Sequence, residues 1–244
     1  YKRQGVMTIA AVINFNGQLG SGGGVPCLYD VYIIGILHVV DTFGVPLLLF
    51  YTLFVERHNQ RIMQVVRERT VNDVWKRCVI DLLILCTFFT VYVFALTTIV
   101  GLLRTNTFYN WGEQYSRCAK WLGKVCEEQP SFVMLLVAYV IETFQCFLIT
   151  GIVMIGVWWC TNKEWAGYVS AIALITIDRS FESPGLIFGS YQVSSYTYKV
   201  GLNLGVNIIY PLIVMVIIFV LVNVAVRFKT VSYTHLTLPT NSLV

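Results

Sequence analysis

Four long runs of apolar residues dominate the chain, and charged residues lie close to the ends of most of them. A helix needs about 20 mainly apolar residues to cross a bilayer, because it advances about 1.5 Å per residue through a hydrocarbon layer about 30 Å thick. The runs that reach this length are Val31–Val55, Val79–Leu103, Phe132–Cys160 and Val206–Val226. The pattern therefore predicts an all-α fold, a polytopic membrane helical bundle with four transmembrane helices.

A shorter apolar run, Trp165–Ile177, has 13 residues. As a helix it extends about 20 Å, which is too short to cross the hydrocarbon layer. We expect a re-entrant or interfacial helix, or a short helix packed within a complex, and we favour the interfacial one. Ala166 and Ser170 are four residues apart in this run, and such small residues permit close helix packing. The pair Gly201 and Gly205, just before the last long run, indicates a second contact of the same kind.

The chain divides into three regions. Residues 1–30 form an N-terminal segment with a Gly-rich linker, residues 31–229 form the transmembrane domain, and residues 230–244 form a tail. The chain begins with Tyr1 rather than Met, and after Lys229 its character changes abruptly. The tail string VSYTHLTLPTNSLV resembles translated adaptor sequence. We therefore expect neither end to be native, and the tail enters no functional argument.

Composition strengthens the membrane prediction. Charged residues make up 12% of the chain, hydrophobic residues 57%, and the mean hydropathy is +0.69. A soluble domain carries about 25% charged residues. An aromatic content of 14% is the reverse of a disordered composition. The net charge of +4 is spread along the chain, so no nucleic-acid partner is predicted. We expect an integral, multi-pass protein surrounded by a lipid bilayer, in a membrane that the sequence does not identify.

The loop Glu56–Arg77 holds six of the 17 basic residues. The positive-inside rule places this loop on the cytosolic, matrix or stromal side of the membrane. The N-terminal segment and the loop 104–131 then lie on the opposite side. Within the basic loop, Thr70 and Asp73 have the spacing of an N-terminal capping pair. They predict the start of a helix that continues into Val79–Leu103.

Two cysteines, Cys118 and Cys126, lie in the loop 104–131. They form a disulfide if that side is oxidising, and two ordinary thiols are an equal alternative. Cys27 lies on the same side and has no obvious partner. No CxxC motif and no paired Cys/His spacing occurs, so the sequence predicts no metal site and no cofactor.

Three ionisable residues fall within the predicted spans. His38 and Asp41 are three residues apart, so they share one face of a helix. Asp41 and Glu142 each lie ten residues from the start of spans that run in the same direction, which places both carboxylates at a similar depth. Ionisable groups inside a bilayer are costly and often functional, so the three form a candidate ion or proton site. The alternative, which we favour, is that they hold helices together or pair with a partner subunit.

The remaining motifs favour a protein without catalysis. No phosphate-binding loop, dinucleotide-binding glycine pattern, Gly-x-Ser-x-Gly elbow or HExxH motif occurs, so we predict that the chain is not an enzyme. The first functional hypothesis is a non-catalytic membrane subunit of a larger complex, with other membrane proteins as partners. The alternative is a channel or transporter subunit that passes a small cation or proton through His38, Asp41 and Glu142.

Overall fold

The computed structural model describes residues 12–13, 17, 19–20, 23–35, 44–55, 71–125, 130–180, 187–188 and 203–236. Its elements are helices, namely α2 (Leu28–Ile34), α4 (Gly44–Phe50), a π-helical segment (Tyr51–Val55), α6 (Val71–Arg104), α7 (Arg117–Leu122), α8 (Phe132–Thr161), α9 (Glu164–Ser180), a π-helical turn (Gly205–Ile209) and α11 (Tyr210–Leu236). Within these described ranges the one β interaction is an isolated bridge between Val25 and Ser116. The all-α prediction is therefore confirmed.

Among the described residues, three helices are long and apolar enough to cross a membrane, rather than the four predicted. They are Asn72–Arg104, Phe132–Thr161 and Gly205–Phe228. The predicted helix Val31–Val55 is interrupted, because α2 ends at Ile34 and the next described helix begins at Gly44. Gly35 closes α2 with a φ of 55°, a conformation that favours glycine, and its N–H donates to the carbonyl of Val31.

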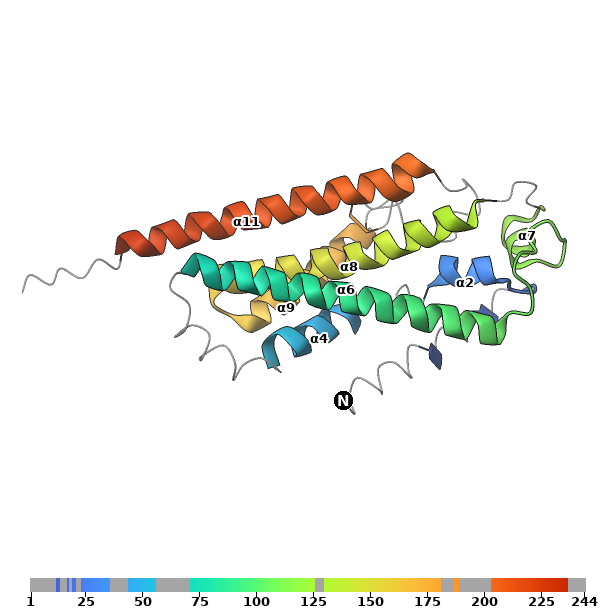
Figure 1. Cartoon of the computed structure of the whole chain (residues 1–244), viewed down its shortest axis with the longest axis horizontal. Coiled ribbons are helices and arrows are strands. Elements are labelled where there is room, and N and C mark those ends of the chain that lie inside the picture. The colour runs from blue at the N-terminus through green and yellow to red at the C-terminus, as the bar shows by residue number, and fades with distance from the viewer. Residues whose placement is uncertain are drawn as a thin grey trace, which may run out of the picture.

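The three long helices do not alternate in direction. α6 runs opposite to α8, but α8 and α11 run the same way (Figure 1). Near the start of both helices, Ile208 packs against the cluster that contains Leu135. Further along, Gly156 of α8 faces Val222 of α11. The chain between Thr161 and Gly205 must therefore return to the end at which α8 begins.

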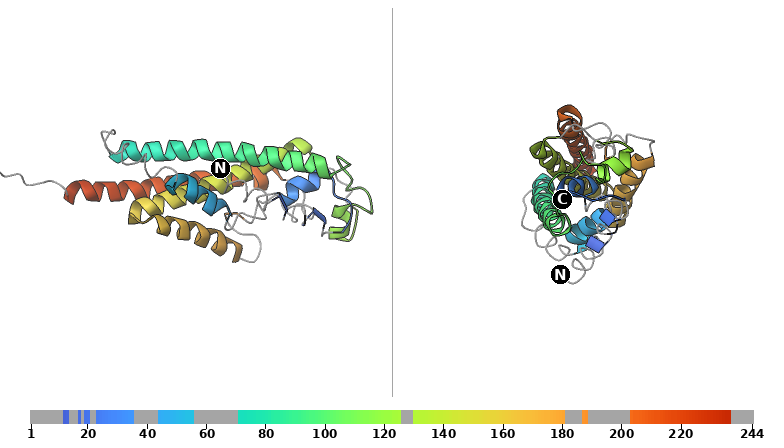
Figure 2. Two further views of the ribbon diagram at one scale, coloured as in Figure 1. Left: turned by 90° about the horizontal axis from the view of Figure 1, so that it is seen from below. Right: turned by 90° about the vertical axis from the view of Figure 1, so that its right-hand side faces the viewer.

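The helix α9 starts that return. α8 ends at Thr161 and is capped by Asn162, which has a left-handed φ of 57° and donates its N–H to the carbonyl of Trp158. α9 then lies along α8 (Figure 2, left). Gly167 makes this approach possible, because a Cβ atom there would lie 2.4 Å from the carbonyl oxygen of Met154. The predicted short helix is thus packed against the bundle, with the ring of Tyr168 5.3 Å from that of Phe50.

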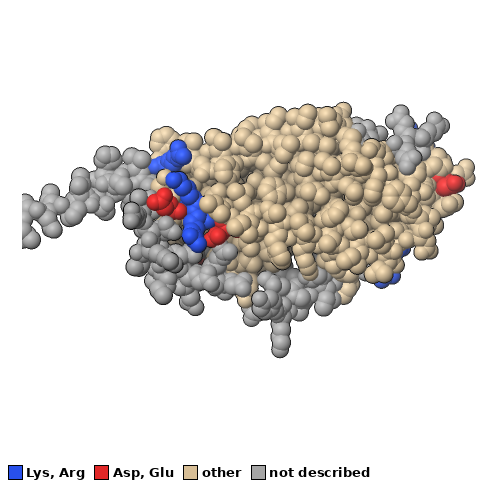
Figure 3. All heavy atoms as spheres, in the orientation of Figure 1, with Lys and Arg blue, Asp and Glu red and all other residues tan. Residues whose placement is uncertain are grey.

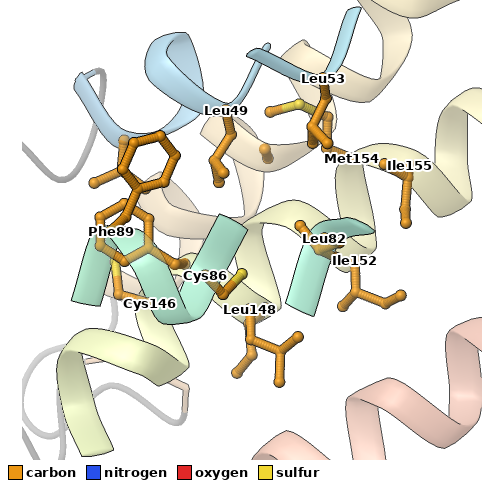
Figure 4. Close-up of a cluster of buried hydrophobic side chains, with 14 of the residues drawn as sticks. Leu49, Leu53, Leu82, Cys86, Phe89, Cys146, Leu148, Ile152, Met154 and Ile155 are labelled. Atoms are coloured by element: carbon orange, nitrogen blue, oxygen red, sulfur yellow. The ribbon is translucent and has the colours of Figure 1, made fainter. Parts of the chain in front are cut away.

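The main hydrophobic core lies where α4, α6 and α8 meet (Figure 4). Leu49 comes from α4, Leu82 and Phe89 from α6, and Ile152 from α8. Gly151 leaves room for Leu82 on the facing helix. α6 itself begins at Val71, where the capping pair predicts a helix start.

Candidate functional site

Of the three predicted ionisable residues, the structure places one. Glu142 lies on α8 and is half-buried. His38 and Asp41 lie outside the described residues, so their meeting with Glu142 stays a prediction. Cys126 and Gly201 also lie outside that part of the chain.

The other predicted positions are described. Cys118 is fully buried in α7. Gly205 is exposed and opens the π-helical turn before α11, where a Cβ atom would meet the side-chain oxygen of Asn203 at 3.3 Å. Ala166 and Ser170 lie on α9, and the Ser170 hydroxyl donates to the carbonyl of Gly167. A close approach to the backbone of α8 occurs at Gly167, between the two predicted residues.

A polar layer, defined as Tyr32, Thr97, Thr98 and Tyr139, joins three helices. The hydroxyls of Thr97 and Tyr139 lie 2.8 Å apart, and those of Tyr32 and Thr98 lie 2.9 Å apart. Thr98 also bonds the carbonyl of Phe94 within its own helix. The Tyr32 and Tyr139 rings meet edge to face at 5.4 Å. The layer thus links α2 and α8 to α6 through hydroxyl groups among apolar side chains.

The Thr97–Tyr139 bond provides a direct test of this layer. We expect Thr97→Val and Tyr139→Phe each to lower the free energy of unfolding by about 1 kcal/mol, the usual range for hydrogen bonds between helices in a bilayer. The double variant should lose little more than either single variant, because both remove the same bond. Thermal unfolding in one detergent measures all four proteins. Fully additive losses would show that the two hydroxyls do not interact.

An Asp178 cluster, defined as Gln145, Asp178, Ile187 and Phe188, lies beside the middle of α8. Asp178 is at the end of α9 and is only 3% exposed. Its two carboxylate oxygens accept the backbone N–H groups of Ile187 and Phe188, each at 2.7 Å. The Gln145 side chain donates to the carbonyl of Ile187 at 2.9 Å. A carboxylate and an amide thus hold one stretch of backbone against α8.

The sequence analysis missed Asp178, because it ends an apolar run and begins a polar stretch. A signal was present in the helical spacing. Asp178 follows the buried Ala171 by seven residues and the buried Ile175 by three. This spacing places all three on one face of α9. Extending the apolar run by one residue identifies Asp178 as a buried acid.

A second buried carboxylate, Asp30, lies near the start of α2. Its oxygens accept the backbone N–H of Cys27 and the indole N–H of Trp111, both at 2.8 Å. Burial raises the pKa of the Cys27 thiol from 9.0 to about 12, and repulsion from Asp30 adds to the rise. The Cys27 sulfur is therefore held as a neutral thiol while it is reduced.

The raised pKa predicts an unusual pH response of the reduced protein. Alkylation of Cys27 in the folded protein should be about a thousandfold slower than in unfolded protein between pH 7 and pH 9, and it should keep rising with pH up to about 12, because the thiolate is the reactive form. In urea-unfolded protein the same labelling should rise about tenfold per pH unit below the ordinary pKa of 9.0. The folded state holds its proton longer, so stability should fall as the pH rises from 9 towards 12. Mass spectrometry of the Cys27 peptide gives both rates, and a folded-state rate that levels off near pH 9, as the unfolded rate does, would contradict the shift.

The described residues contain no group of three or more His, Cys, Asp and Glu side chains placed to hold a metal ion. In the polar layer the hydroxyls of Thr97 and Tyr139 bond to each other, and in the Asp178 cluster the carboxylate bonds to the backbone. Comparison with known proteins adds no assignment: no family model matches the chain, and no curated protein or solved structure shows significant similarity to it.

Proposed function

We propose that the chain is a multi-pass integral membrane protein and a non-catalytic subunit of a larger membrane complex. The observation that carries this proposal is the exposed surface of α11. In its most apolar 18-residue window, 11% is buried within the chain, compared with 50% for the α8 helix. A helix able to cross a bilayer is therefore left with most of its surface for lipid or for other subunits.

The attachment of α11 runs along one stripe. Up to Phe228, the buried positions of α11 are Pro211, Met215 and Val226, and Asn207 of the preceding π-helical turn extends the stripe. Near its far end, the side-chain oxygen of Asn223 accepts the indole N–H of Trp75 at 2.8 Å. The side chains that point away from this stripe are large and apolar, namely Ile213, Val216, Ile217, Val220, Leu221 and Val224. Helices in bilayers associate through close packing, which one stripe provides only in part.

The distribution of charge supports a membrane environment. On the face drawn in Figure 3, acidic and basic side chains gather towards the two ends, and the band between them carries none among the residues that are coloured. Arg77 and Arg227 lie towards one end of the long helices, and Arg104 and Lys120 lie towards the other. Such a band matches the hydrocarbon layer between two charged interfaces.

The proposal is tested by extracting the tagged chain from its native membrane in mild detergent. We expect a particle several times larger than the 27.7 kDa chain, with unlike membrane proteins in fixed ratio. The double variant Val216→Phe/Val220→Phe adds bulk to the exposed face of α11 and should release those proteins. Val91→Phe, at a position of α6 that is 62% exposed like Val216, is the matched control. A particle that contains this chain alone would overturn the proposal.

A proton or cation pathway is a second candidate function. It is supported by the half-buried Glu142 of α8 and by Asp178, a buried acid beside the same stretch of that helix. The test measures proton or cation flux in liposomes that contain the purified chain. If this function is correct, Glu142→Gln and Asp41→Asn should each abolish the flux. Asp73→Asn, at the exposed start of α6, is the control. Flux that survives both substitutions would eliminate the pathway.

A further inference from the structure

Two buried cysteines lie on chain segments that the structure joins directly. The backbone of Val25 accepts the N–H of Arg117 and donates to the carbonyl of Tyr115, which forms a parallel bridge between Val25 and Ser116. Bridged backbones lie about 5 Å apart. Cys27 follows the bridge by two residues on one segment, and Cys118 follows it by two residues on the other. The bridge thus brings the two segments that carry the cysteines side by side.

The surroundings of the two side chains are shared. Cys27 and Cys118 both have an exposure of 0% and belong to the same hydrophobic cluster, together with Tyr29, Trp111 and Leu135. Further contacts hold the two segments in place. The Asn110 side chain donates to the carbonyl of Val25 at 2.8 Å, and a Cβ atom on Gly24 would lie 2.9 Å from the Ser116 carbonyl oxygen.

We propose that Cys27 and Cys118 form a disulfide that ties the segment before α2 to the start of α7. The bond joins the two Sγ atoms and releases both thiol protons. Its two electrons pass by thiol–disulfide exchange to an oxidised protein disulfide, which is reduced to a dithiol. Both cysteines are thiols in the structure, so the proposed bond forms when this reduced arrangement is oxidised.

The site's position in the molecule agrees with oxidation. Cys27 and Cys118 lie at the end where α6 finishes and α8 begins, and the basic loop precedes the opposite end of α6. By the positive-inside rule, the cysteines then face the lumenal, periplasmic or external side, where disulfides persist. The bond would close a loop that contains α2, α4 and α6. The proposed bond also provides Cys27 with a partner. A bond between Cys118 and Cys126 would leave Cys27 outside any disulfide.

The test uses the full chain in its native membrane. Thiols are blocked with N-ethylmaleimide in denaturing detergent without reductant, and chymotryptic and tryptic peptides are analysed by mass spectrometry. We expect one cross-linked species that contains Cys27 and Cys118 and separates on reduction. Cys126→Ser should retain it. Cys27→Ser should abolish it and expose Cys118 to labelling, and Cys118→Ser should expose Cys27 in the same way.

Two results would overturn the assignment. One is a cross-link between Cys118 and Cys126 in the wild-type chain. The other is full labelling of Cys27 and Cys118 without reductant. Both are read from the wild-type protein, so they do not depend on whether a serine variant folds. Because the measurement identifies a bond within one chain, it is also independent of whether the chain assembles with other subunits.

Discussion

Replacing Asp178 with alanine is expected to lower the free energy of unfolding by about 2–6 kcal/mol. The substitution removes both acceptors of the Ile187 and Phe188 N–H groups, and each buried donor left without a partner costs about 1–3 kcal/mol. It also frees the backbone that Gln145 holds, so the return from α9 should loosen. Thermal unfolding and limited proteolysis in detergent measure the two effects.

The controls separate this role from a general effect of charge. Asp178→Asn keeps one side-chain acceptor, so it should lose roughly half as much stability as the alanine variant. Asp73→Ala removes an acid of the α6 capping pair whose contact with Lys76 is exposed and 3.7 Å long, and it should cost about 1 kcal/mol. Equal losses for Asp178→Ala and Asp73→Ala would show that the Asp178 cluster does not hold the chain.

Replacing Gly167 with valine is expected to separate α9 from α8. A Cβ atom at this position would lie 2.4 Å from the carbonyl oxygen of Met154, and a backbone atom cannot move aside as a side chain does. We expect a loss of about 3 kcal/mol or more, at the upper end of the cost of overpacking a core. Thermal unfolding gives the loss, and faster cleavage within residues 164–202 would show where the bundle opens.

Two further glycines make the comparison specific. At Gly151 the nearest atom to a new Cβ belongs to the Leu82 side chain, which can rotate, so Gly151→Ala should cost less than Gly167→Ala. At Gly112 no atom lies within 4 Å, so Gly112→Ala should be nearly neutral. If the free energy of unfolding falls by the same amount in all three alanine variants, the close approach of α9 to α8 is not what holds these two helices together.

Hydrophobic length predicts the long helices well, because a run of apolar residues is a local property of the chain. The run Phe132–Cys160 becomes the helix Phe132–Thr161, and the capping pair indicates the start of α6. The same reasoning fails for Val31–Val55. Its apolar content continues past Gly35, but the backbone conformation of that glycine ends α2.

The candidate site was less predictable, because its bonds join residues that are distant in sequence. The depth of Glu142 on its helix follows from counting residues, and α8 carries it as expected. The partners of Asp178 do not follow from any count. They depend on how the chain reverses direction at Asn162, between α8 and α9. They also depend on the hydrogen bond between the Gln145 side chain and the Ile187 carbonyl. Hydropathy also does not reveal how a short helix such as α9 is placed. A helix that packs on a neighbouring helix has the same apolar content as one that lies at the membrane interface.

The hairpin of α8 and α9 sets an order for how the chain enters a bilayer during synthesis. With 17 residues, α9 extends about 25 Å and cannot be inserted as an independent crossing. Its close contact at Gly167 exists only when α8 is already beside it. We therefore expect the two helices to enter as one unit. α11 is inserted after this unit and in the same direction as α8.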